Sequence, residues 1–228
     1  MPSLNLSRQE NVFVLSLDNS AKQNTLTDDV LDEWHAALDE VENSNGNAAL
    51  VITSSDAKIW SNGIDLDYVM GKGGENYLRN HFVGRVDSLL VRLAWLNLPT
   101  VGCITGHAFG GGALIASTLD FRTMRADKGF FCFPEVDIKL PFTPIMQACV
   151  DLLPGAALRW EMALTGKRVG GIEAAKGDIV NAALDEASLL PTTMGLAAQL
   201  AQKDRKTYTI IKRNFRSQWA VWHAAGKR

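Results

Sequence analysis

The stretch GHAFGGGALIASTLD, residues 106–120, places three consecutive glycines at the start of an otherwise apolar segment. The preceding residues, 98–104, read as a buried strand, and a short helix is predicted to begin at Gly111. Because glycine inside a helix or strand costs about 0.5–1 kcal/mol relative to alanine, three together indicate a backbone that comes close to something. Either a ligand lies against this backbone, or the glycines only let the helix pack closely on the sheet.

The start of the predicted helix has the chemistry of an anion site. Its first N–H groups have no intrahelical acceptor, and the helix dipole favours negative charge beside them. A carbonyl that becomes an enolate would be stabilised there, as in an oxyanion hole. A phosphate-binding loop fits less well, because no Gly-Lys-Ser/Thr follows the glycines.

Strands and helices alternate on both sides of the glycines. We predict strands at 11–17, 48–53, 121–124 and 130–133, a helix capped by Thr27, and a long helix at about 75–96. From Pro144 onward the pattern is mostly helical. This alternation predicts an α/β fold with one main domain and a helical C-terminal part.

The bulk composition is that of an ordinary globular protein, with 228 residues, 46% hydrophobic, 21% charged and a net charge of −2. We therefore expect neither nucleic acid nor a membrane as the main partner. Cys103, Cys132 and Cys149 lie among apolar neighbours without metal-like spacing, so we expect buried thiols and no metal site. With no signal-peptide pattern at the N-terminus, the expected location is the cytoplasm.

Several motifs together resemble the crotonase (enoyl-CoA hydratase/isomerase) superfamily. The segment WSNGIDL, residues 60–66, is similar to the family's Phe-Ser-x-Gly-x-Asp-Leu, and residues 99–112 match its Pro…Gly-x-Ala-x-Gly-Gly-Gly motif. The turn KQNTL at 22–26 and the segments at 163–166 and 173–180 follow in the family's order, so the resemblance runs from about 8 to 215. It implies a spiral of ββα units over 1–190, a helical trimerisation or lid region over 191–228, and a homotrimer or dimer of trimers.

The resemblance also implies a site for an acyl-CoA thioester, with no cofactor beyond the CoA of the substrate. The backbone N–H groups of Ile64 and Gly111 would hold the thioester carbonyl. The residues implied to contact the substrate are Lys22, Leu26, Asp65, Leu66, Phe109, Gly110, Leu114, Pro134 and Lys212. Among these, Lys22 and Lys212, with its neighbour Arg213, are the candidates for the CoA phosphates, although all three are equally consistent with solvated charges.

The residue types at two positions favour one reaction of the family. Its hydratases carry two glutamates, one of them three residues after the donor glycine, where this chain has Leu114. The other lies in a Pro-Glu pair, present here as Pro134-Glu135, and the surrounding FFCFPEVDI resembles the monofunctional Δ3,Δ2-enoyl-CoA isomerases. Glu135 alone would then move a proton from C2 to C4 of a 3-enoyl-CoA and give the 2-trans isomer.

Other assignments remain open at this point. The chain could instead be an enoyl-CoA hydratase or another crotonase-type acyl-CoA enzyme, or a non-catalytic acyl-CoA-binding protein. We expect an apolar wall of Phe131, Phe133, Val136 and Leu114 to raise the pKa of Glu135. Asp137 is the reserve acid, and His107 is more consistent with packing than with catalysis. Asp120 is expected to be structural, and Asp65 and Asp67 to orient the loop around Ile64.

Overall fold

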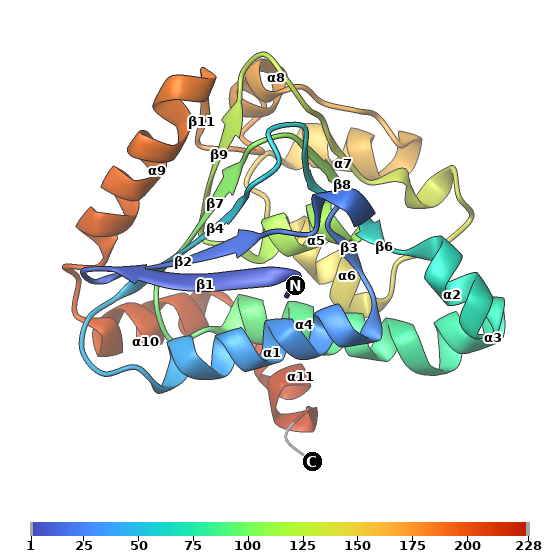
Figure 1. Ribbon diagram of the computed structural model, residues 1–228, viewed down its shortest axis with the longest axis horizontal. Helices are drawn as coiled ribbons and strands as arrows, with labels where there is room; N and C mark the ends of the chain where they lie inside the picture. The colour runs from blue at the N-terminus through green and yellow to red at the C-terminus, as the bar shows by residue number, and fades with distance from the viewer. Residues whose placement is uncertain (1, 227–228) are drawn as a thin grey trace.

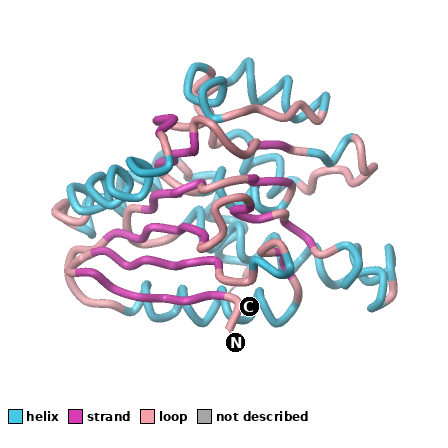
Figure 2. The backbone as a smooth tube through the Cα atoms, turned by 45° about the horizontal axis from the view of Figure 1, so that its top comes forward, coloured by secondary structure: helices cyan, strands magenta, loops and turns pink. Residues whose placement is uncertain are grey.

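In a computed structural model, which describes residues 2–226, the main sheet has six strands. Their order across the sheet is β1 (Leu4–Gln9), β2 (Val12–Leu17), β4 (Ala49–Ser54), β7 (Thr100–Ile104), β9 (Phe121–Arg125) and β11 (Ala182–Leu184). Strands β1 and β2 pair in antiparallel fashion, with Leu4 opposite Leu17, and every other neighbour is parallel. The tube in Figure 2 shows these strands side by side, with helices on both sides of them.

Two smaller parallel sheets lie beside the main one. The first has the order β10 (Phe131–Cys132), β8 (His107–Phe109) and β5 (Ile59–Ser61), and the second pairs β3 (Thr25–Leu26) with β6 (Gly63–Ile64). Strands β5 and β6 follow β4 directly, and β8 follows β7. The small sheets therefore bring together the chain segments that contain the glycine motifs.

The helices connect the strands and form the C-terminal part. They are α1 (Asp28–Asn43), α2 (Leu66–Lys72), α3 (Gly74–Tyr77), α4 (Val83–Trp95), α5 (Gly111–Thr118), α6 (Pro144–Asp151), α7 (Ala156–Thr165), α8 (Gly171–Lys176), α9 (Glu186–Leu200), α10 (Arg205–Phe215) and α11 (Ala220–Ala225). Short turns of other types are η1 (Ser20–Lys22), η2 (Leu78–Phe82, a π-helix), η3 (Pro134–Val136) and η4 (Ser217–Trp219). Within residues 2–226, no helix is long and apolar enough to cross a membrane.

The two faces of the main sheet are buried by different helices (Figure 1). Successive side chains of a strand point to opposite faces. Accordingly, Leu50 and Ile52 of β4 join the main core, whereas Ala49 and Val51 join a second cluster that includes Leu189 of α9. A strand covered on both faces reads as a continuous apolar run, which explains the pattern at 48–53.

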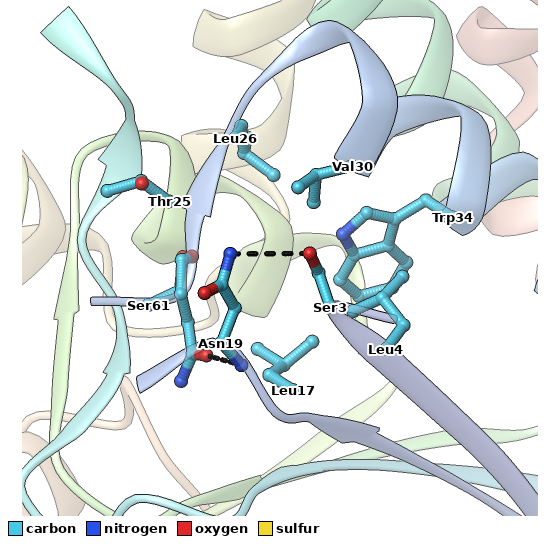
Figure 3. Close-up of a pocket in the computed structure, with 10 residues that line it drawn as sticks. Ser3, Leu4, Leu17, Asn19, Thr25, Leu26, Val30, Trp34 and Ser61 are labelled. Atoms are coloured by element: carbon cyan, nitrogen blue, oxygen red, sulfur yellow. Dashed lines mark hydrogen bonds between the residues drawn. The ribbon is translucent and has the colours of Figure 1, made fainter. Parts of the chain in front are cut away.

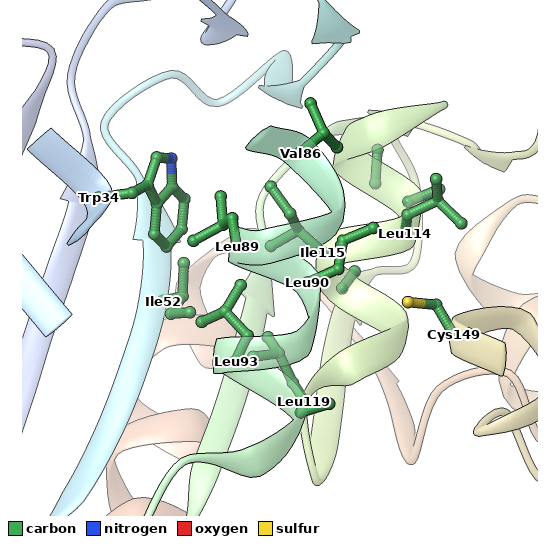
Figure 4. Close-up of a cluster of buried hydrophobic side chains, with 14 of the residues drawn as sticks. Trp34, Ile52, Val86, Leu89, Leu90, Leu93, Leu114, Ile115, Leu119 and Cys149 are labelled. Carbon is green, nitrogen blue, oxygen red and sulfur yellow. The ribbon is translucent and has the colours of Figure 1, made fainter. Parts of the chain in front are cut away.

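The main core surrounds helix α5, all of whose residues are buried. Figure 4 shows its side chains Leu114 and Ile115, with Leu119 just after the helix, between α4 and Cys149 of α6. Helix α5 is thus enclosed on all sides, so its first turn is held rigidly at one end of the core.

Most predicted elements are present, with differences that have local causes. The long predicted helix is divided into α3, η2 and α4, because five residues at 78–82 form a π-helix instead of α-helical turns. Strands β1 and β11 were not predicted, because both are only partly buried and lack a strong apolar pattern. The strand predicted at 130–133 is limited to two residues.

The helical C-terminal part packs on the rest of this same chain. Helix α9 lies against the main sheet through Leu189, Thr193 and Ala197, which are buried. The predicted boundary between residues 190 and 191 falls inside α9. Residues 227 and 228 of the predicted region lie outside the described residues.

Candidate active site

The two predicted backbone donors lie next to each other. Gly111 is the first residue of α5, where an N–H group has no acceptor within the helix. A Cβ atom placed on Gly111 would be 3.5 Å from the backbone nitrogen of Ile64 and 3.2 Å from the Cα of Gly63. The backbone segments of Ile64 and Gly111 therefore lie against each other, which is the closeness that an oxyanion hole with donors from two segments requires.

A different physical reason favours glycine at each of the three consecutive positions. Gly110 has φ of 51° and ψ of −120°, a conformation that side chains disfavour. A Cβ on Gly112 would lie 2.9 Å from the carbonyl carbon of Ser61, and closer still to its oxygen. A Cβ on Gly111 would lie 3.3 Å from Leu26 Cδ1, a tight contact. Close packing of the helix, one of the two alternatives left open by the sequence, is thus confirmed for Gly112.

A buried amide supports the loop that carries Ile64. The side-chain amide of Asn24 donates to Ser54 Oγ at 2.9 Å and to the Trp60 carbonyl at 3.1 Å. The backbone carbonyl of Asn24 accepts from Ser61 Oγ at 2.8 Å. Ser61 Oγ in turn accepts from Gly63 N–H at 3.1 Å. This chain of bonds fixes the residues just before the donor. The sequence placed Asn24 in a CoA-contacting turn and did not indicate its buried structural bonds.

A small polar void lies beside this network. Figure 3 shows Asn19, Ser61 and Thr25 around it, with Asn19 donating to Ser3 Oγ at 3.3 Å. Its volume of about 10 Å³ is the room for one water molecule. The void is too small for a substrate, so it belongs to the support of the loop.

Glu135 is a buried carboxyl beside the donor segment. It lies in η3, its residue is 6% exposed, and its Oε2 has no hydrogen-bond partner among the described residues. Its Oε1 is 3.6 Å from the position of a Cβ on Gly110. Burial raises the pKa of Glu135 to about 7. A carboxyl with this pKa takes up and releases a proton near neutral pH, as a general acid–base group does.

Three of the four residues predicted to form an apolar wall around Glu135 are buried. Phe131 and Phe133 are fully buried, and Leu114 is 1% exposed in the core. Val136 differs from the prediction, because half of its surface is exposed and it forms no closed wall. Leu114 is three residues after Gly111 and thus on the same side of α5 as the donor.

The structure brings together most of the other predicted contact residues. Leu26 is buried, with Cδ1 3.3 Å from the Cβ position of Gly111, and Asp65 caps α2 by accepting from Tyr68 N–H at 2.9 Å. Leu66 begins α2 and is exposed. The remaining contact residues adjoin the site through the chain: Phe109 and Gly110 precede the donor glycine, and Pro134 precedes Glu135. Lys22 is exposed at the end of η1, before β3.

Lys212 is a correction to the sequence-based expectation. Its side chain is 4% exposed, and Nζ pairs with Asp120 Oδ2 at 3.0 Å and donates to the Leu98 carbonyl. An ammonium group held in this way cannot reach a CoA phosphate. Arg213 is also engaged, donating to the Trp95 carbonyl at 2.9 Å. Asp120 is structural, as predicted.

His107 and Asp137 are two further titratable side chains that the sequence analysis named. His107 Nδ1 accepts from Phe130 N–H at 3.2 Å, and burial together with Arg168 and Lys58 lowers its pKa. Asp137 is exposed and lies against Gly166, at the end of α7. Sequence reasoning missed Arg168, whose guanidinium lies 5.4 Å from the centre of the Phe109 ring. In the sequence, Arg168 is marked only by its positive charge in a predicted loop.

A metal site requires several ligating side chains close together. Within residues 2–226, no group of three or more His, Cys, Asp or Glu side chains has an arrangement that could hold a metal ion.

Comparisons with known proteins bear on this arrangement. The family described as enoyl-CoA hydratase/isomerase matches residues 7–225. Enoyl-CoA delta isomerase 3 of Arabidopsis thaliana is 29% identical over 215 residues, covering 92% of this chain and 90% of that protein. Carnitinyl-CoA dehydratase of Escherichia coli strain K12 is 28% identical over 225 residues, covering 94% and 80% respectively.

The solved structures agree on the fold. A crystal structure of an enoyl-CoA hydratase/isomerase family protein from Pseudomonas syringae has a TM-score of 0.88 at 20% identity, covering 98% of this chain and 94% of that chain. A probable enoyl-CoA hydratase of Mycobacterium tuberculosis gives a TM-score of 0.85 at 21% identity, covering 98% and 92%. The crotonase-like fold that the sequence predicted is thereby confirmed.

Proposed function

The chain belongs to the enoyl-CoA hydratase/isomerase family, and on that premise we propose that it shifts the double bond of a 3-enoyl-CoA to the 2-trans position. The observation that carries this proposal is the pairing of one buried carboxyl, Glu135, with an apolar residue, Leu114, next to the two N–H donors. One proton carrier is sufficient to isomerise. Hydration in this family uses a second glutamate, and here its position is occupied by a leucine.

The reaction begins with the thioester carbonyl of the substrate accepting hydrogen bonds from Ile64 N–H and Gly111 N–H. The Glu135 carboxylate then removes a proton from C2. The electron pair of that C–H bond forms the C1–C2 double bond of a dienolate, and negative charge develops on the thioester oxygen. Each N–H donor of such a hole typically contributes about 3–4 kcal/mol to the transition state.

The second half returns the same proton to another carbon. Electrons move from the oxygen back through C2 to form the C2–C3 double bond, while those of the C3–C4 double bond take the proton from Glu135 at C4. The carboxylate is regenerated and no other reactant is consumed. A dry surrounding of Phe131 and Phe133 favours this return over attack by water.

A hydratase is the second candidate function, because the carnitinyl-CoA dehydratase of Escherichia coli is nearly as similar to this chain as the delta isomerase. The leucine at position 114, where a hydratase of this family has its second glutamate, argues against hydration. Acyl-CoA binding without catalysis would leave the raised pKa and buried position of Glu135 without a role.

Glu135→Gln tests the proposed reaction. We expect turnover of a 3-enoyl-CoA to fall by about 10²–10⁴-fold, while the affinity for the thioester changes little. Asp137→Asn, in the same segment, is the matched control and is expected to retain wild-type turnover. Near-normal isomerisation by Glu135→Gln would contradict the mechanism, and efficient hydration of a 2-enoyl-CoA by the unmutated protein would favour the second candidate.

The proposal extends to setting and assembly. We propose that the protein acts in the cytoplasm on unsaturated intermediates of fatty-acid β-oxidation, and that it forms a homotrimer or a dimer of trimers. Exposed apolar residues on α10 and α11 support self-association: Ile210, Ile211, Phe215 and Val221. Sedimentation equilibrium would give three or six copies, and a monomer would contradict the proposed assembly.

A further inference from the structure

A groove of about 360 Å³ lies between the two halves of the site. One wall consists of Leu66, Glu75, Leu78 and Arg79, and the other of Ile138, Lys139 and Leu140. Leu66 is two residues after the donor Ile64, and the opposite wall begins three residues after Glu135. The groove therefore adjoins both the segment of the donor Ile64 and the segment of Glu135.

The first wall belongs to a segment that is poorly stabilised by its own hydrogen bonds. Residues 66–82, which we call the covering segment, consist of α2, α3 and η2, with seven, four and five residues. Helices this short are unstable in isolation. Gly73 and Gly74 interrupt them with φ of 138° and 62°. The covering segment needs contacts with the rest of the molecule to keep one position over the groove.

Asp28, the first residue of α1, supplies polar contacts of this kind, in addition to the buried side chains of Val69, Leu78 and Phe82. Its Oδ2 accepts from Tyr68 Oη at 2.8 Å and from Tyr77 Oη, and its Oδ1 pairs with Arg85. His81 Nε2 lies 3.4 Å from the same Oδ1. One carboxylate thus joins α2, α3, η2 and α4 at the end of α1 where these elements meet (Figure 1).

The charge of this carboxylate is well stabilised. The Asp28 side chain is only 17% exposed. Burial alone would raise its pKa, but the hydrogen bonds from Tyr77, Tyr68 and Arg85 lower the pKa to about 2. Two tyrosine hydroxyls and a guanidinium directed at one ionised group form strong, charge-assisted bonds. These bonds are more than the capping of α1 requires, because Thr27 already caps that helix.

We propose that Asp28 is a positioning residue that holds the covering segment over the groove and thereby sets the affinity for long acyl chains. The proposal rests on the proposed acyl-CoA function. A short acyl group ends near Glu135 and does not reach Leu78, so its binding does not depend on the covering segment. A long acyl group lies against Leu66 and Leu78, and it loses these contacts when the segment moves away.

The test measures binding of two saturated, unreactive thioesters, butanoyl-CoA and dodecanoyl-CoA, by titration calorimetry. In Asp28→Asn we expect dodecanoyl-CoA to bind about tenfold more weakly, and butanoyl-CoA to bind within about twofold of wild type. Tyr77→Phe, which removes one hydroxyl and no charge, should shift the same ratio in the same direction and remains informative if Asp28→Asn folds poorly. Hydrogen exchange should become faster in residues 66–82 of both variants.

Glu42→Gln is the matched control. It weakens the bond that Arg92 makes between α1 and α4, at 2.6 Å, but it contacts no residue of the covering segment. We expect no change in the ratio of the two affinities. The proposal is overturned if both thioesters weaken equally in Asp28→Asn, or if neither does.

These outcomes are separate from those of the proposed reaction. If the wild type binds both saturated thioesters but does not isomerise a 3-enoyl-CoA, the reaction is wrong and the role of Asp28 stands. If the wild type binds neither thioester, the acyl-CoA assignment and the role of Asp28 both fail.

Discussion

At the scale of the residue, the proposed acid–base role of Glu135 requires a raised pKa, and the raised pKa costs stability. Its pKa is about 7 in the folded protein, against 4.5 for a free glutamate. Between these two pH values the folded state keeps the proton and the unfolded state has released it, so stability falls as pH rises through this window. The full loss, reached above about pH 7, is roughly 3 kcal/mol.

Glu135→Gln cannot titrate, so it should not show this loss. We expect the free energy of unfolding of the variant, relative to wild type, to be higher by roughly 3 kcal/mol at pH 8 than at pH 4.5. Urea denaturation of both proteins at the two pH values, at one fixed protein concentration, measures this difference. An unchanged difference between the two pH values would mean that Glu135 is not a buried acid with a raised pKa.

Substitution of Leu114 tests what decides between isomerisation and hydration. Leu114→Glu places a second carboxyl on the donor side of α5, where a neighbouring like charge raises a pKa and helps to hold water. We expect some 3-hydroxyacyl-CoA from a 2-enoyl-CoA, detected by chromatography, together with a lower stability from the buried charge. Leu114→Gln, equally polar but unable to ionise, should produce no hydration. Hydration by both variants would contradict the role of the carboxyl.

The residues of the site differ in how far sequence could identify them. Glu135 was predictable because its Pro-Glu pair and the aromatic residues around it are local in the chain. Lys212 was misassigned because its partner, Asp120, is 92 residues away. Nothing near Lys212 in the sequence distinguishes a buried ion pair from an exposed phosphate ligand. The residues next to Glu135 in the chain thus pointed to it as the candidate acid. The residues next to Lys212 did not indicate its ion pair with Asp120.

At the scale of the element, the start of α5 depends on how closely it approaches β5. A Cβ on Gly112 would lie 2.9 Å from the Ser61 carbonyl carbon, which belongs to the backbone and cannot rotate away. We expect Gly112→Ala to destabilise the protein by about 2 kcal/mol or more and to lower turnover, because α5 must move and take the Gly111 donor with it. Thermal unfolding and the isomerase assay give the two readouts.

Gly195 provides the matched control for this element. It lies inside α9, is exposed, and has nothing within 4 Å of its Cβ position. We expect Gly195→Ala to stabilise the protein by about 0.5–1 kcal/mol without affecting turnover. If Gly112→Ala behaved as Gly195→Ala does, close packing would not be the reason for glycine at this position.

Elements were predictable from the sequence where burial makes a periodic pattern. Helix α1 follows Thr27 and buries Leu31, Trp34, Leu38 and Val41 at helical spacing, as predicted. Strand β11 has three half-buried residues and is defined by its pairing with β9. Pairing with a strand far away in the chain produces no pattern within three residues, so nothing local distinguishes β11 from the helices around it.

At the scale of the whole molecule, one buried cluster ties the C-terminal helices to the core. Asp120, after α5, pairs with Lys212 of α10 at 3.0 Å and with Arg216 at 2.9 Å. It also accepts from Thr100 N–H and from Tyr208 Oη. Lys212 and Arg216 lower the pKa of Asp120 against the opposing effect of burial, so the carboxyl stays charged.

We expect Asp120→Asn to be strongly destabilising, by about 3–5 kcal/mol, because it leaves two buried cations without their partner. Since the folded-state pKa of Asp120 is lowered, its contribution is complete at neutral pH and is lost as pH falls, so wild type and variant should converge in acid. Lys212→Met alone removes one cation and keeps the Arg216 pair. Adding Lys212→Met to Asp120→Asn should therefore cost less than the sum of the two changes, because residues in one ion-pair cluster are not additive. Denaturant unfolding of the four proteins measures this coupling, and simple additivity would show that the C-terminal helices are held mainly by their apolar contacts.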